Sequence, residues 1–424
     1  MWHHTRTVPR HPAIAGLTAE IRGSVFSALA HRLDGFPGET YPFHVGDTWL
    51  EPPPGTRLAE LDRGAAHHRY APPSGHPLFV DALVDRTRAR TGMPIERAQV
   101  YPTAGATAGL FAVCRALLDQ GEQVLVLAPY WPLIDGIVRA CGAEPVAVPV
   151  YGNGDGGDTG DCESAEELIE RLDRRASPRT AALYLSSPNN PSGRVLPRSW
   201  VEAMTEWARR RDLWLLSDDV YEAFVYPDAA PAAEPASHTE VMPLAPERTI
   251  TTHSCSKAYA MAGHRCGWVV GPAVVLDAAR KVGTHTFYST PTGAQVAAVA
   301  ALREGAPWLR AAARQYQAAG RVAASVLGLA QPQGGTFLFF DVAPALDDSG
   351  LFGFLEACAD RGLLLAPGLS FGPYPTWVRL CFTASPLEVT RRGVEVLRRV
   401  LDERRAATAL GGSPSPAAHG GHAP

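Results

Sequence analysis

Five side chains with useful chemistry each lie shortly after an apolar run in the central part of the chain. They are an indole, an amide, a carboxylate, a phenol and a primary amine, in Trp131, Asn190, Asp218, Tyr221 and Lys257. Each is weak evidence alone, because Pro-Tyr-Trp and Asn-Pro-Ser-Gly are ordinary turn sequences. Their order on successive strand ends is informative, since a parallel sheet brings such ends to one edge. We therefore expect them to share one site.

The amine is rare in this chain. The 424 residues contain only two lysines, Lys257 and Lys281, whereas arginine is abundant. Lys257 follows the apolar run 249–253 within the sequence Ser-Cys-Ser-Lys. A nucleophilic lysine amine can therefore come from only two positions. The residues that surround Lys257 in the sequence favour Lys257 over Lys281.

The apolar runs predict the scaffold. Nearly continuous runs, typical of buried parallel strands, alternate with helical patterns. The candidate strands are 123–127, 145–150, 180–186, 213–217, 249–253 and 267–270, and the candidate helices include 108–119, 165–175 and 199–211. This alternation predicts a doubly wound α/β sheet, in which ligands bind outside the carboxyl ends of the strands.

The side chains at these ends suit the atoms of pyridoxal 5′-phosphate (PLP). An amine such as Lys257 forms a Schiff base with the aldehyde and later moves a Cα proton. A carboxylate such as Asp218 keeps the pyridine nitrogen protonated, while Tyr221 and Asn190 can bond the phenolic oxygen. Trp131 can stack on the ring, with the preceding tyrosine as the alternative.

The segment 101–107 is a natural cradle for the phosphate. It leads straight into a predicted helix, and backbone N–H groups at a helix N-terminus bind phosphate oxygens. Gly105 and Ala106 belong to this cradle, Thr107 adds a hydroxyl, and Arg265 supplies positive charge.

The stretch 254–267, Ser-Cys-Ser-Lys-Ala-Tyr-Ala-Met-Ala-Gly-His-Arg-Cys-Gly, closely resembles the lysine signature of the class I/II aminotransferases. These are the aspartate-aminotransferase-like enzymes of PLP fold type I, and the resemblance runs from about residue 46 to 398. It implies that Lys257 is the Schiff-base lysine and that Ser254 and Arg265 hold phosphate. It also gives the carboxylate, the phenol, the amide and the indole the roles described above.

Further segments match the same family. Tyr70 lies in a segment resembling the one whose tyrosine reaches the phosphate of the neighbouring subunit, which implies a homodimer. Arg379 lies in a segment resembling the one whose arginine grips the substrate α-carboxylate, a bidentate pairing. Gly46 stands where the family places a glycine against that carboxylate, and Asn190 and Trp131 border the same substrate site.

The family's fold type implies how the chain is divided. A large domain, 51–318, carries the mostly parallel doubly wound sheet and the predicted cofactor site. A smaller α+β domain is built from both chain ends, 16–50 and 319–408. An N-terminal arm, 1–15, and a tail rich in Gly, Pro, Ser and Ala, 409–424, flank these domains, and we expect the tail to be disordered.

Composition narrows the range of partners. A net charge of -4 gives no reason to expect a nucleic acid, and no apolar run is long enough to span a membrane. Seven scattered cysteines without a Cys-x-x-Cys pair indicate reduced thiols in the cytoplasm, and we predict no metal site. The acidic, glycine-rich segment 152–158 lacks a flanking EF-hand pattern and is expected to be a surface loop. The expected partners are an amino acid and a keto acid.

The resemblance implies an aminotransferase acting on an L-amino acid, with a place in specialised metabolism as one option. A lyase performing C–S β-elimination, or an oxidative deaminase, would use the same residues, because these reactions diverge only after the Cα proton is removed. His285 falls near the position where aspartate-specific relatives carry an arginine, which disfavours a dicarboxylate substrate. Trp49, Phe287 and Phe337 predict an apolar-lined substrate pocket.

Overall fold

A computed structural model describes residues 21, 28–61, 65–152, 160–227 and 238–411. The predicted arm, most of the predicted tail and nearly all of the glycine-rich loop fall outside the described residues. None of the described helices is long and apolar enough to cross a membrane.

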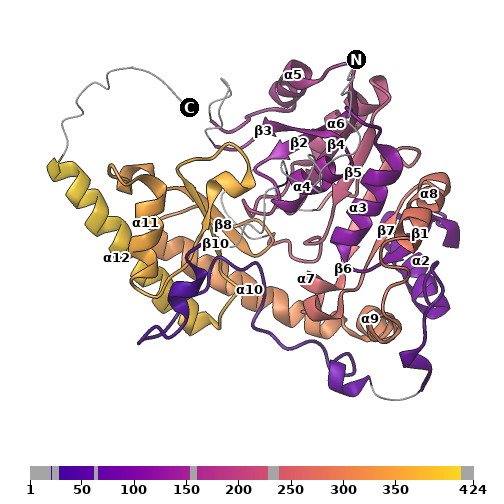
Figure 1. Cartoon of the computed structure of the whole chain (residues 1–424), viewed down its shortest axis with the longest axis horizontal. Coiled ribbons are helices and arrows are strands. Elements are labelled where there is room, and N and C mark those ends of the chain that lie inside the picture. Colours follow the sequence, from indigo (N-terminus) through magenta and orange to yellow (C-terminus); the bar gives the residue numbers. More distant parts are fainter. Residues whose placement is uncertain (1–20, 22–27, 62–64, 153–159, 228–237, 412–424) are drawn as a thin grey trace, which may run out of the picture.

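A seven-stranded sheet forms the centre of the larger part of the molecule (Figure 1). Its strands are β1 Val100–Thr103, β2 Gln123–Ala128, β3 Glu144–Pro149, β4 Thr180–Ser186, β5 Trp214–Asp218, β6 Thr249–Ser254 and β7 Gly267–Val270. The spatial order is β1-β7-β6-β5-β4-β2-β3, and within it β7 runs antiparallel to both of its neighbours. The other pairs are parallel, which confirms the predicted mostly parallel, doubly wound sheet.

Helices cover both faces of this sheet. The α-helices are α2 Pro77–Thr91, α3 Ala106–Leu117, α4 Leu133–Ala140, α5 Ala165–Arg175, α6 Arg198–Arg210, α7 Cys255–Ala258, α8 Ala273–Thr284, α9 Thr292–Glu304, α10 Ala306–Leu327, α11 Gly350–Ala359 and α12 Leu387–Gly411. Because strand side chains alternate between faces, Val124 and Val126 pack with α3, α4 and α8, whereas Leu125 and Leu127 pack with α5 and α6. Burial on both faces explains why these strands read as continuous apolar runs.

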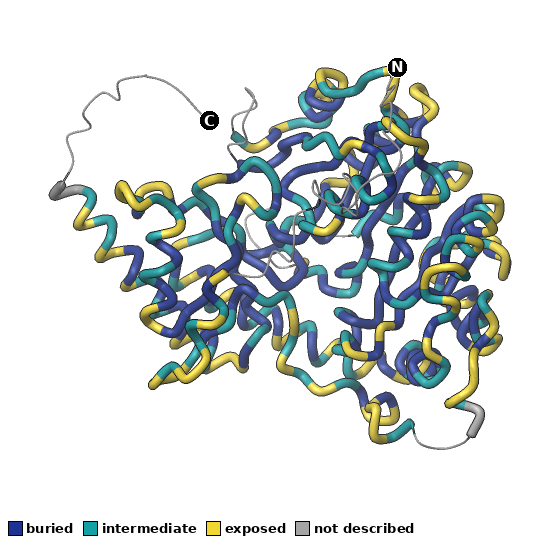
Figure 2. Tube along the Cα trace, in the orientation of Figure 1, coloured by how far each residue is buried: buried dark blue, intermediate teal, exposed yellow. Residues whose placement is uncertain are grey.

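A second, three-stranded antiparallel sheet forms the core of the smaller part. Its strands are β8 Phe337–Asp341, β9 Ala366–Pro367 and β10 Trp377–Cys381, in the order β8-β10-β9. The N-terminal residues Tyr41 and Phe43 belong to the same hydrophobic core as α10, α11 and α12. The long helix α10 extends from the large sheet into this smaller part, and Figure 2 shows both interiors as buried chain. The three-stranded sheet lies within the predicted small domain, although the boundary at residue 319 falls inside α10 and stays a prediction.

Some elements differ from the sequence prediction at their ends. Helix α3 begins at Ala106 rather than at residue 108, because Gly105 adopts φ +83° and takes the N-cap position. Strand β1, just before it, was not predicted as a strand; it is four residues long and pairs with β7. Helix α12 continues to Gly411, beyond the predicted start of the tail at residue 409.

Candidate active site

One cavity at the carboxyl ends of β4, β5 and β6 gathers nearly all of the predicted site residues. Gly105 and Tyr70 do not line it, whereas the others do: Gly46, Ala106, Thr107, Trp131, Asn190, Asp218, Tyr221, Ser254, Lys257, Arg265 and Arg379. The predicted convergence of strand ends is therefore what the fold produces. Gly46 and Arg379 reach the cavity from the smaller part, so the site lies between the two sheets.

Lys257 lies on the short helix α7, which is capped by Ser254 accepting a 3.0 Å hydrogen bond from the Ser256 N–H. The Lys257 Nζ donates to the Gly46 carbonyl at 2.5 Å. Burial lowers the pKa of this amine, and nearby Arg379 and Arg265 act in the same direction. A lowered pKa makes the uncharged amine more available, which is the form that acts as a nucleophile or takes up a proton.

Asp218 ends β5 beside Ser186, the last residue of the parallel strand β4. Burial raises the pKa of its carboxyl, and its two hydrogen-bond donors carry no charge. These are the Tyr184 hydroxyl at 2.7 Å and the Val220 N–H at 3.4 Å. Sequence reasoning missed Tyr184, because it lies inside an apolar run where a tyrosine resembles ordinary core.

Arg379 is held by contacts on several sides. Its Nη1 donates to Asn190 Oδ1 at 3.1 Å, and its Nη2 donates to the His44 carbonyl at 2.7 Å. The guanidinium lies over the Phe337 ring at 4.5 Å and the Phe371 ring at 4.7 Å. Contacts with both rings, together with the two hydrogen bonds, restrict the guanidinium, as recognition of a carboxylate requires.

Gly46 and His44 shape the space beside Arg379. A Cβ on Gly46 would lie 3.0 Å from the Phe337 ring and 3.8 Å from Arg379 Nη1, so a side chain there would press on the carboxylate-binding group. His44 also lines the cavity and was missed in the sequence. Burial, together with Arg379, lowers the pKa of its imidazole to about 4, so His44 is neutral at pH 7.

The opposite end of the cavity is built around the N-terminus of α3. A Cβ on Gly105 would lie 2.5 Å from Arg265 Nη2, so the missing side chain leaves room for the guanidinium. Ala106 and Thr107 form the first turn of the helix, and both line the cavity. Free N–H groups, a hydroxyl and a guanidinium together form an anion site.

Tyr221 and Trp131 complete the walls. Burial raises the pKa of the Tyr221 phenol, so it stays a hydrogen-bond donor at neutral pH. Its ring meets Phe337 edge to face at 5.6 Å. Trp131 lines this cavity, whereas Tyr130 lines a neighbouring one. Of the two aromatic residues, only Trp131 is therefore placed where it could meet a bound ring.

The sequence profile of the family described as "Aminotransferase class I and II" matches residues 41–397. The chain belongs to the class I and II aminotransferases. An arginine–pyruvate transaminase of Pseudomonas aeruginosa is 34% identical over 339 residues, 78% of this chain and 81% of that protein. An aspartate/prephenate aminotransferase of Thermus thermophilus is 32% identical over 341 residues, 78% of this chain and 83% of that protein.

Solved structures agree with these sequence relationships. An aspartate aminotransferase from Thermus thermophilus with maleate has a TM-score of 0.80 and 28% identity, covering 92% of this chain and 100% of that one. The predicted family, its fold type and the assignment as an aminotransferase are therefore confirmed. The relatives named here are aminotransferases and give no support to the lyase alternative.

Several residues predicted to border the substrate lie elsewhere in this aminotransferase. Trp49 lines a separate groove beside α10, and Phe287 stacks on Tyr101 at 6.3 Å. The Phe337 ring packs against the Arg379 guanidinium and is not one of the residues that line the cavity. The apolar lining comes instead from Leu110, Leu133, Val220 and Phe371. Which apolar side chains line the cavity is decided by tertiary contacts, and the sequence does not show these contacts.

Tyr70 does not reach the cavity of its own chain. It is 85% exposed and meets Tyr288 edge to face at 5.1 Å. It lines a surface groove together with Arg265, which also lines the active-site cavity. Tyr70 is therefore accessible to another chain that approaches this groove.

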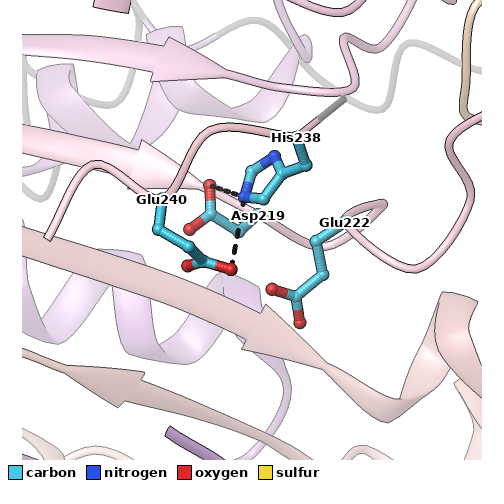
Figure 3. A group of neighbouring side chains, drawn as sticks. All are labelled: Asp219, Glu222, His238 and Glu240. Carbon is cyan, nitrogen blue, oxygen red and sulfur yellow. Dashed lines mark ion pairs between the residues drawn. The ribbon is translucent and has the colours of Figure 1, made fainter. Parts of the chain in front are cut away.

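A cluster of possible metal ligands begins one residue after Asp218 and consists of Asp219, Glu222, His238 and Glu240 (Figure 3). One ligand atom of each lies within 4.8 Å of the others. Arg86 and Arg90 of α2 supply compensating charge: Arg86 pairs with Glu222, and Arg90 pairs with Glu240 at 2.5 Å.

The remaining carboxyl of this cluster belongs to Asp219. Burial raises the pKa of Asp219 to about 8, so this group carries a proton at neutral pH. Two arginines and one proton thus balance the three carboxyls, and the protein's own groups neutralise the cluster without a cation.

Proposed function

We propose that this aminotransferase uses PLP, bound through Lys257, to transfer the amino group of an L-amino acid to a keto acid. The observation that carries the proposal is the meeting of Lys257, Asp218 and Arg379 in one cavity. They offer an amine of lowered pKa, a buried carboxyl group and a guanidinium that packs against two aromatic rings. Each matches a different part of the cofactor and substrate.

The residues present fit this cofactor. Asp218 is a buried carboxyl whose two hydrogen-bond donors are neutral, so a protonated ring nitrogen would add a charged donor to them. Arg265 and the first turn of α3 would hold the phosphate, with Ser254 and Thr107 adding hydroxyls. Tyr221 and Asn190 would donate to the phenolic oxygen, and Trp131 would cover the ring.

When bound, PLP supplies a carbonyl that takes up the substrate amino group and a ring that accepts the electron pair left at Cα. Lys257 Nζ would take the proton from the substrate Cα and return it to the carbon of the cofactor's aldehyde group, which requires the uncharged amine favoured by burial. Asp218 would hold the proton on the ring nitrogen. Arg379 anchors the α-carboxylate through two parallel N–H groups, which fixes the Cα–H bond relative to Lys257.

The substrate is proposed to carry an uncharged side chain. The lining that remains after the anchoring groups have been assigned is largely apolar: Leu110, Leu133, Val220 and Phe371. His44 is neutral and adds no charge. The relatives named for arginine and for aspartate or prephenate show that the family accepts varied side chains, so the lining of each protein decides its preference.

We further propose a homodimer in the cytoplasm. A highly exposed Tyr70 in a groove that includes Arg265 supports a role for this phenol at the phosphate of a second subunit. The seven cysteines are all free and buried, which suits a reducing compartment. Sedimentation of the purified protein tests the dimer, and a monomer at micromolar concentration would contradict it.

A half-reaction tests the main proposal. The PLP-loaded protein is mixed with a panel of amino acids in the absence of a keto acid, and the cofactor spectrum and products are followed. We expect one keto acid per site, with stoichiometric conversion to pyridoxamine phosphate, and faster conversion of neutral amino acids than of aspartate or arginine. Catalytic release of ammonia, pyruvate or hydrogen peroxide would instead indicate a lyase or an oxidative deaminase.

A further inference from the structure

Tyr184 and Asp218 form a buried pair on adjacent parallel strands. The register pairs Ser186 of β4 with Asp218 of β5, so Tyr184 lies two residues back on the same face of the sheet. The Tyr184 hydroxyl donates to Asp218 Oδ2 at 2.7 Å. Tyr184 is fully buried, and its ring packs in the core formed by α3, α4 and α8. The phenol therefore approaches Asp218 from the side of the protein interior.

This hydrogen bond is the shorter of the two that Asp218 accepts. The other comes from the Val220 N–H to Oδ1 at 3.4 Å, a long contact. The ionisable groups around the pair include His253 of β6, Cys114 of α3, the chain neighbour Asp219 and Tyr221. Burial alone favours the protonated form of Asp218, and a donated O–H favours the anion.

We propose that Tyr184 is a positioning residue for the transamination reaction: its hydroxyl fixes Asp218 Oδ2 and keeps the carboxylate anionic for the cofactor's ring nitrogen. The inference rests on the proposed use of PLP. An Asp218 that is less basic leaves the proton on the ring, where it is needed to draw electrons from Cα. Without the hydroxyl, the proton shifts toward Asp218 and the ring becomes a weaker electron acceptor.

A packing role is the alternative, because any buried phenol needs a hydrogen-bond partner. Tyr226 provides a matched control. It is also buried, and its hydroxyl donates at 2.7 Å to the Gly335 carbonyl instead of to a carboxylate. Tyr184→Phe and Tyr226→Phe each remove one buried hydroxyl, but only the first touches Asp218.

The test measures the dissociation constant of PLP in wild-type protein, Tyr184→Phe, Asp218→Asn, the double variant and Tyr226→Phe. We expect Tyr184→Phe to weaken binding about tenfold, the scale of a hydrogen bond to a charged group. The same substitution should have no effect in the Asp218→Asn background, and Tyr226→Phe should bind like wild type. Such non-additivity is what direct coupling predicts.

A cofactor analogue with carbon in place of the ring nitrogen gives a second readout. For this analogue, wild type and Tyr184→Phe should bind equally, because no ring proton remains to be shared. The inference would be overturned if Tyr184→Phe weakened PLP binding equally with and without Asp218. It would also be overturned if Tyr184→Phe weakened binding of the carbon analogue as much as binding of PLP. Either result would show a packing role. A wild-type protein that fails to bind PLP at all would overturn the proposed function as well.

Incorporation of 3-fluorotyrosine at position 184 covers the case in which Tyr184→Phe does not fold. Fluorine keeps the ring shape and makes the hydroxyl a stronger donor. We expect PLP to bind more tightly than in wild type, again only when Asp218 is present. Unchanged or weaker binding in this variant would contradict the proposed role of the hydroxyl.

Discussion

Arg379 Nη1 donates a 3.1 Å hydrogen bond to Asn190 Oδ1 across 189 positions of the chain. Arg379 lies on β10 of the small sheet, whereas Asn190 follows β4 of the large one. The bond therefore joins the group predicted to grip the substrate to one predicted to touch the cofactor. Relative movement of the two sheets would change both contacts together, so the carboxylate site depends on how the two parts pack.

Replacement of Arg379 by lysine tests the bidentate site. Lysine keeps the charge but loses the planar fork and its packing between Phe337 and Phe371. We expect kcat/KM for the amino acid to fall about hundredfold, mainly through KM. Arg398→Lys is the control, because its ion pair with Asp402 is exposed and far from the chemistry. Equal effects of the two substitutions would contradict the assignment.

Gly105→Ala tests the cradle at the start of α3. The new Cβ would meet Arg265 Nη2 at 2.5 Å, so the guanidinium must move. We expect about tenfold weaker binding of PLP, since one charged hydrogen bond is lost. Gly121→Ala is a close control, because Gly121 also has a positive φ of +86° but open space around its Cβ position. Both variants place an alanine at positive φ, which costs roughly 1–3 kcal/mol of stability, and only Gly105→Ala should affect the cofactor.

Lys257→Met addresses the energetic cost of the buried amine. Its folded-state pKa is lowered by burial, so the unfolded chain binds more protons at pH values between this lowered pKa and the ordinary lysine value. Lys257 therefore costs stability at pH 7, and this cost disappears as pH rises towards about 10.4. We expect the cofactor-free variant to melt at a higher temperature than wild type at pH 7, and the difference to shrink by pH 10.

The same variant should show no PLP-dependent visible absorbance band and no turnover. Lys281→Met is the control, because Lys281 forms an exposed ion pair with Asp277 and should leave both properties unchanged. Retained turnover in Lys257→Met would refute the central assignment of the site.

Glu222→Gln tests the cluster formed by Asp219, Glu222, His238 and Glu240. Burial alone would raise the pKa of Glu222, yet Arg86, His253 and Arg90 together lower it well below its ordinary value. Its stabilising effect is thus present above about pH 4.3 and is lost as pH falls below it. We expect the variant to lose about 3 kcal/mol at pH 7, measured by thermal unfolding, with the gap closing in acid. Glu388→Gln, at an exposed pair with Arg391, should change little.

Much of the fold could be read from the sequence because its signals are local. Buried parallel strands produce continuous apolar runs, and β4 and β7 were bounded correctly as 180–186 and 267–270. The first residue of α3 was harder to predict. It depends on the positive φ of Gly105 and on the Arg265 guanidinium, which occupies the space that a side chain on Gly105 would take. Strand β1 is short and gains its identity from pairing with β7, which no local pattern reports.

The sequence by itself was enough to predict the groups that we propose react in this aminotransferase. Lys257, Asp218, Asn190 and Tyr221 follow strand ends, and parallel strands must place such ends along one edge. Only the tertiary structure decided their surroundings. Tyr184 resembles ordinary core in the sequence and is a donor to Asp218 in the structure, while Trp49 and Phe287 line other grooves. A side chain's partner across two strands or two sheets depends on packing between segments far apart in the chain, and local sequence carries no record of that packing.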